Sequence, residues 1–146
     1  MMTAAQEALT NSSSRPLLIA VTLLTSINRV LLRQIGLTGS PEENVLRLAQ
    51  LAHQAGLNGV VCSGLEASVL RQAQGENFLL ITPGIRPSSA PAEDQQRVLT
   101  PREATARGVD YLVIGRPITA APDPMKALEA IETEINTAAQ DGPLRY

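Results

Sequence analysis

Four short apolar segments alternate with segments of helical character, and this alternation limits the folds open to the chain. The apolar segments cover residues 17–24, 59–63, 78–82 and 111–114. Each is followed by residues with helical spacing or helix-capping signals. Strands that alternate with helices in this way pair in parallel through right-handed crossovers. The sequence therefore predicts an α/β fold, either an open doubly wound sheet or part of a (β/α)8 TIM barrel.

The length of the chain decides how much of a barrel it can form. A complete (β/α)8 barrel typically needs about 250 residues, whereas this chain has 146. Four strand–helix units make half a barrel, which we place in residues 1–139, with a frayed tail over residues 140–146. A helix over residues 3–9 precedes the first strand, over residues 17–24, which we expect to be buried on both faces.

Capping residues mark where several helices begin. Ser40 and Glu43 have the spacing of a capping box, and Thr100 and Glu103 repeat it. Asp123 is the expected cap of the last helix, which we place over residues 125–138. Shorter helices are expected over residues 28–34 and 66–73.

Composition excludes several classes of function. The net charge of −2 argues against nucleic-acid binding, which needs a basic face. The single cysteine, Cys62, cannot form an internal disulfide, is interpreted as a buried small apolar residue, and fits a reducing compartment. His53 has no partner at metal-ligand spacing, so no metal site is predicted. The apolar run 17–24 is too short to span a membrane and no cationic leader precedes it, so we expect a cytoplasmic protein.

Two arginine-containing loops follow the third and fourth predicted strands. Residues 82–87 read Thr-Pro-Gly-Ile-Arg-Pro, and residues 115–117 read Gly-Arg-Pro. Glycine lets a backbone approach a ligand closely, and arginine offers a charged fork that matches phosphate oxygens. Loops at the carboxyl ends of neighbouring parallel strands meet at one edge, which favours a phosphate cradle built on Arg86 and Arg116. The alternative is that both are surface arginines beside tight turns.

A long polar loop over residues 86–99 follows the third strand. Loops of this length in compact domains are often lids, and Gln95 has a side chain that can hydrogen-bond a ligand. The alternative interpretation is a solvated polar loop.

Five segments together resemble the C-terminal half of the bacterial orotidine 5′-phosphate decarboxylase family. They are residues 20–26, 59–63, 82–87, 94–101 and 109–118, in the family's order. The resemblance implies a (β/α)8 barrel that converts orotidine 5′-phosphate to uridine 5′-phosphate (UMP) and carbon dioxide, in the last step of UMP biosynthesis, without a cofactor. It implies that Arg86, Gly115 and Arg116 hold the substrate phosphate, that Gln95 closes over the ligand, and that Thr25 contacts it.

The family's catalytic motif, Asp-x-Lys-x-x-Asp, does not occur in this chain. The one lysine, Lys126, lies in the last predicted helix and is interpreted as a solvated surface residue. No catalytic residue is therefore assigned, and we expect the chain alone to be inactive. As part of a decarboxylase it should self-associate or require the missing N-terminal half. Alternatives are a non-catalytic phosphate- or UMP-binding half barrel or interaction module, and a related barrel enzyme such as a hexulose-phosphate synthase.

Overall fold

The computed structural model of the chain describes residues 1–10, 12–88 and 98–140. Its strands are β1 (Ile19–Val21), β2 (Gly59–Val61), β3 (Leu79–Pro83) and β4 (Tyr111–Val113). Its helices are α1 (Met2–Thr10), α2 (Arg29–Gln34), α3 (Pro41–Gln54), the 3-10 helix η1 (Gly64–Glu66), α4 (Ala67–Gln74), α5 (Pro101–Ala106), α6 (Arg116–Thr119) and α7 (Pro124–Gln140).

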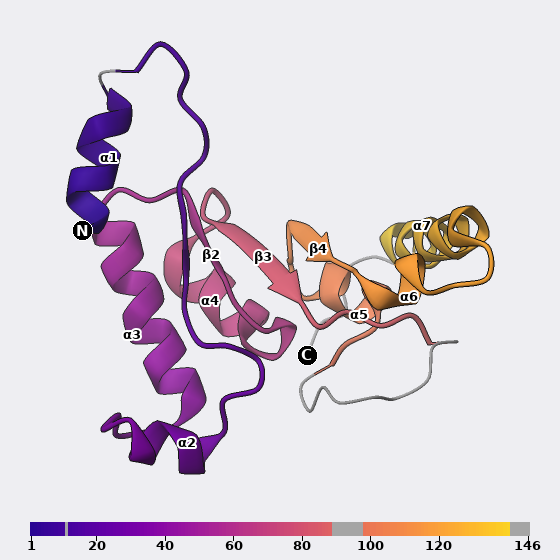
Figure 1. Ribbon diagram of the computed structural model, residues 1–146, viewed down its shortest axis with the longest axis horizontal. Coiled ribbons are helices and arrows are strands. Elements are labelled where there is room, and N and C mark those ends of the chain that lie inside the picture. Colours follow the sequence, from indigo (N-terminus) through magenta and orange to yellow (C-terminus); the bar gives the residue numbers. More distant parts are fainter. Residues whose placement is uncertain (11, 89–97, 141–146) are drawn as a thin grey trace.

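The four strands form one parallel sheet in the order β1-β2-β3-β4. Val21 lies opposite Val61, Val61 opposite Ile81, and Ile81 opposite Tyr111, so one row of side chains crosses all four strands. Figure 1 shows α3 beside the β1 end of the sheet, and α6 and α7 beyond β4. The alternation of strands and helices predicted from the sequence is confirmed.

One face of the sheet carries the core. Val60 and Leu80 lie opposite each other in neighbouring strands, and both are fully buried. They belong to an apolar cluster with Val45 of α3, Leu70 of α4 and Ala104 of α5. Because side chains alternate between the faces of a strand, this face contains every second residue of β2 and β3.

The opposite face is open to solvent. Val21 is 60% exposed and Tyr111 is 53% exposed. We call this face, opposite to the core, the inner face. It consists of Ile19, Gly59, Leu79, Val21, Val61, Ile81, Tyr111, Pro83 and Val113. The prediction that the first strand is buried on both faces is therefore wrong, since β1 is three residues long and covered on one side.

Both predicted capping boxes are present, at Ser40 with Glu43 and at Thr100 with Glu103. At the start of α7, the carboxylate of Asp123 accepts a hydrogen bond from the backbone N–H of Lys126 (3.1 Å). The short helix α6 was not expected, and α7 continues to Gln140. The predicted tail beyond it lies outside the described residues. Of the helices in the described ranges, none has the length and apolarity needed to cross a membrane.

The capping box of α5 gives a pH-dependent prediction. The Glu103 carboxylate accepts hydrogen bonds from the Thr100 backbone N–H and hydroxyl, both at 2.9 Å. The hydrogen bond from the Thr100 backbone is the main cause that lowers the Glu103 pKa below its ordinary 4.5. Partial burial acts in the opposite direction, whereas the Thr100 hydroxyl and the positive charge of Arg107 lower the pKa further. A carboxylate whose pKa is lower in the folded than in the unfolded state stabilises the protein at pH values above the unfolded-state pKa. This stabilisation is lost as the pH falls through the folded-state pKa.

We therefore expect Glu103→Gln to lower the free energy of unfolding at pH 7 by about 0.3–1 kcal/mol, the usual effect of a charge at a helix N-terminus. The difference between the two proteins should shrink in acid, where Glu103 becomes protonated. Urea denaturation at neutral and acidic pH measures it. A difference that does not change with pH would contradict this prediction.

Candidate functional site

The strands that precede the two arginine-containing loops are neighbours and end together. Pro83 at the end of β3 lies opposite Val113 at the end of β4. Arg86 comes three residues after Pro83, and Gly115 comes two residues after Val113. Both loops therefore start at the same edge of the sheet, where parallel α/β proteins bind their ligands.

The loop after β3 is held in place by its backbone. Gly84 has φ of +77°, a conformation that side-chain-bearing residues rarely adopt. Ile85 forms a parallel bridge with Leu99, and the Arg86 N–H donates to the Leu99 carbonyl (2.9 Å). Ile85 and Leu99 are both buried. The half-buried side chain of Arg86 thus starts from a fixed backbone position.

The loop after β4 is open. Gly115 is exposed and precedes α6, and its carbonyl accepts hydrogen bonds from the N–H groups of Ile118 (2.9 Å) and Thr119 (3.0 Å). A Cβ atom built on Gly115 would meet no atom within 4 Å. The adjacent Arg116 is exposed as well. A ligand can therefore approach the backbone at Gly115 with a guanidinium next to it.

Thr25 lies at the same end of the sheet, after β1. It is half-buried and lines a hollow of about 340 Å³. The other lining residues are Val21, Leu23, Leu24, Ser26, Val61 and Pro83. Since Pro83 also begins the Arg86 loop, this hollow links the end of β1 to the arginine-containing loops.

Gln95 lies outside the described residues, so the structure does not place it. The hydrogen bond between Arg86 and Leu99 does place the two flanks of the predicted lid side by side.

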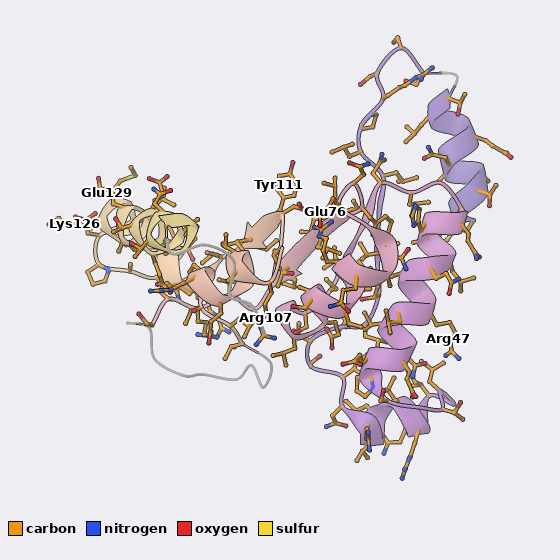
Figure 2. All side chains as sticks on the ribbon, turned by 180° about the vertical axis from the view of Figure 1, so that it is seen from behind. Arg47, Glu76, Arg107, Tyr111, Lys126 and Glu129 are labelled. Carbon is orange, nitrogen blue, oxygen red and sulfur yellow. The ribbon has the colours of Figure 1, made fainter. Side chains whose placement is uncertain are left out.

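Lys126 lies away from this site. Figure 2 shows it on α7, at the end of the molecule farthest from β1. Its ammonium lies 3.6 Å from the Asp123 carboxylate, and its side chain is well exposed. The interpretation of Lys126 as a surface residue is confirmed.

His53 and Cys62 both make contacts within the fold. The exposed His53 ring stacks on Phe78 with 4.9 Å between centroids, and its Nδ1 lies 2.7 Å from Gln74 Oε1. Cys62 is buried, with its Sγ 3.9 Å from the Thr82 hydroxyl. The interpretation of Cys62 as a buried small apolar residue is confirmed. Among the described residues, no three His, Cys, Asp or Glu side chains gather as metal ligands.

Buried polar residues at the end of β2 escaped the sequence interpretation. Ser63 and Glu66 are both buried, and the Ser63 hydroxyl accepts a hydrogen bond from the Leu65 N–H (3.3 Å). A Cβ on Gly64 would lie 2.6 Å from Leu99, so this turn packs against the flank of the Arg86 loop. The Ser-x-x-Glu spacing, a capping-box pattern, was the available signal.

Comparisons with known proteins agree on one family. The sequence model of the orotidine 5′-phosphate decarboxylase / HUMPS family matches residues 1–131. The orotidine 5′-phosphate decarboxylase of Nitrosococcus oceani is 68% identical over 136 residues, covering 93% of this chain and 59% of that protein. The Hydrogenovibrio crunogenus protein of the same name is 56% identical over 135 residues, covering 92% and 57%.

Solved structures show the same partial coverage. The crystal structure of orotidine 5′-phosphate decarboxylase from Lactobacillus acidophilus superimposes with a TM-score of 0.77 at 40% identity. The match covers 93% of this chain and 58% of that one. The chain thus spans less than three fifths of the length of these relatives, and its sheet corresponds to part of their barrel.

Proposed function

Because the chain belongs to the orotidine 5′-phosphate decarboxylase / HUMPS family, we propose that it supplies the phosphate-binding half of an orotidine 5′-phosphate decarboxylase. Its ligands are then orotidine 5′-phosphate and UMP, and its location is the cytoplasm. The observation that supports this most is the common end of β3 and β4, from which the loops carrying Arg86 and Arg116 both leave.

In this proposal the two arginines bind the 5′-phosphate. Each guanidinium donates to phosphate oxygens, and the open backbone at Gly115 lets the phosphate approach. Thr25, in the hollow beside Pro83, contacts the nucleoside portion, and Gln95 closes over the ligand from the lid. Phosphate binding supplies energy that holds the reacting part of the substrate in position, although the phosphate itself does not react.

The chain lacks the group that the reaction needs. Loss of carbon dioxide leaves an electron pair on a pyrimidine carbon, which a nearby cation must stabilise and a proton must then neutralise. In the family, the lysine of the Asp-x-Lys-x-x-Asp motif has this role. Lys126 is on α7, away from the strand ends. We therefore propose that the isolated chain binds UMP without catalysing decarboxylation.

We predict that Arg116→Ala weakens UMP binding about 10- to 100-fold, because hydrogen bonds to a charged group contribute roughly 1.5–3 kcal/mol. Isothermal titration calorimetry of the 146-residue chain with UMP measures the change. Arg107→Ala is the matched control, because Arg107 follows α5, at the opposite end of β4 from Arg116, and should leave affinity unchanged.

Two results would argue against the proposed function. The first is a failure of the unaltered chain to bind UMP, or equal UMP affinity of Arg116→Ala and Arg107→Ala. The second is decarboxylation of orotidine 5′-phosphate by the isolated chain, followed by ultraviolet absorbance. Turnover would mean that another group in this chain replaces the missing lysine.

A further inference from the structure

The side chain of Leu99 occupies a closed seat beside the end of β2. Its Cδ1 lies over Gly64, so close that a Cβ atom on Gly64 would be 2.6 Å from it. The methyl group of Thr82 borders the same space, 3.4 Å from the position of that Cβ. Gly64 and Thr82 are buried, and Leu99 is 8% exposed. Because protein interiors are close-packed, Leu99 can leave this seat only if the surrounding core opens.

The backbone of Leu99 in turn holds the backbone of Arg86. The Leu99 carbonyl accepts the Arg86 N–H (2.9 Å), and Leu99 pairs with Ile85 in a parallel bridge. Ile85 is 3% exposed and belongs to the same apolar cluster as Leu99. The next residue, Thr100, caps α5 and accepts the Glu103 N–H (3.2 Å) on its hydroxyl. Leu99 therefore ties the backbone of Arg86 to η1 and to the start of α5.

We propose that Leu99 is a positioning residue for Arg86, because its buried side chain fixes the backbone from which the guanidinium reaches the ligand phosphate. This inference rests on the proposed function, since it takes the phosphate as the ligand of Arg86. Paired hydrogen bonds from a guanidinium to phosphate oxygens tolerate little displacement of the donor. Arg116 starts from the exposed turn at Gly115, after a different strand. Leu99 should therefore act on only one of the two arginines.

A purely structural role for Leu99 predicts a different pattern of effects, and Leu57 supplies the comparison. Leu57 is 5% exposed and belongs to the same apolar cluster. It precedes β2, at the opposite end of the sheet from the arginine-containing loops. Replacing either leucine with alanine leaves a cavity and lowers stability. Only Leu99→Ala should also release Arg86, so Leu57→Ala is the matched control.

Isothermal titration calorimetry with UMP measures the effect on binding. Leu99→Ala should weaken UMP binding about 10-fold, because a small misplacement of a positioned group is costly. In a chain that already carries Arg86→Ala, Leu99→Ala should cause no further loss, since the two changes remove the same interaction. Leu99→Met keeps the volume of the side chain and should retain the affinity. Leu57→Ala should retain it as well.

Two binding results would overturn the proposal. One is a loss of affinity of the same size whether or not Arg86→Ala is present. The other is an equal loss in Leu99→Ala and Leu57→Ala. Circular dichroism establishes that each variant has folded. If Leu99→Ala does not fold, Leu99→Val, which removes one methylene group, takes its place in the same comparisons.

Hydrogen exchange of the Arg86 amide tests the proposal without any ligand. In Leu99→Ala this amide should exchange about 10-fold faster relative to the Asp110 amide, which donates to the Leu80 carbonyl (3.0 Å) before β4. In Leu57→Ala the ratio of the two rates should equal that of the unaltered chain. An unchanged ratio in Leu99→Ala would overturn the proposal. If the unaltered chain binds no UMP, the proposed function fails, and the exchange ratio still decides whether Leu99 holds Arg86.

Discussion

Arg71→Met is expected to lower the free energy of unfolding by about 1.5–3 kcal/mol, the usual contribution of hydrogen bonds to a charged group. The Arg71 side chain is only 11% exposed. Its Nη2 lies 2.7 Å from the Asp110 carboxylate and donates to the Gly108 carbonyl at the same distance. Its Nη1 donates to three further carbonyls, those of Gly75 (2.9 Å), Glu76 (3.0 Å) and Phe78 (2.8 Å).

These hydrogen bonds join segments that are far apart in the sequence. Arg71 lies in the last turn of α4. Asp110 precedes β4 and also accepts a hydrogen bond from the Leu80 N–H (2.7 Å). Methionine fills a similar volume but donates nothing, so partly buried carbonyls and a carboxylate would lose their donor. The turns before β3 and β4 would then lose their common anchor.

Urea denaturation monitored by circular dichroism measures this loss. Arg33→Met, at an exposed position near the end of α2, is the matched control and should stay within about 0.5 kcal/mol of the unaltered chain. Arg71→Lys should recover less than half of the loss, because a single ammonium cannot reach both turns. Equal stability of Arg71→Met and Arg33→Met would show that this cluster of hydrogen bonds contributes nothing.

Gly59→Ala is expected to cost about 3 kcal/mol or more, at the upper end of the range for overpacking. A Cβ on Gly59 would lie 2.2 Å from the Leu79 carbonyl oxygen and 2.6 Å from the Leu79 Cβ. The carbonyl belongs to the backbone of β3, which cannot turn aside as a side chain could. The neighbouring Asn58 is hydrogen-bonded on both sides. Its N–H donates to the Leu18 carbonyl, next to β1, and its carbonyl accepts from the Leu79 N–H of β3.

The sign of this effect distinguishes it from ordinary glycine replacement. Where alanine fits the native backbone without strain, glycine to alanine stabilises a protein by about 0.4–1 kcal/mol, because it restricts the unfolded chain. Gly115→Ala is the control, since a Cβ there meets no atom within 4 Å. Thermal denaturation of both variants should show a large loss for Gly59→Ala alone. Equal melting temperatures would mean that β2 and β3 separate at no cost.

Sequence patterns determined the local structure because their causes are local. The apolar segments, the two capping boxes and the interpretation of Lys126 each rest on a few adjacent residues, and all three are confirmed. The family resemblance from ordered motifs is confirmed as well, by the family model over residues 1–131. The roles of Thr25, Arg86, Gln95, Gly115 and Arg116 stay predictions that the binding experiment tests.

Only the tertiary structure decided which residues meet across long stretches of chain. The contact of Arg71 with Asp110 spans 39 positions, and the clash at Gly59 exists only because Leu79 lies opposite it. The burial of β1 on one face instead of two also depended on which segments the tertiary structure brings against it. An apolar segment reveals what can be buried, but whether anything covers it depends on the neighbours that the fold supplies.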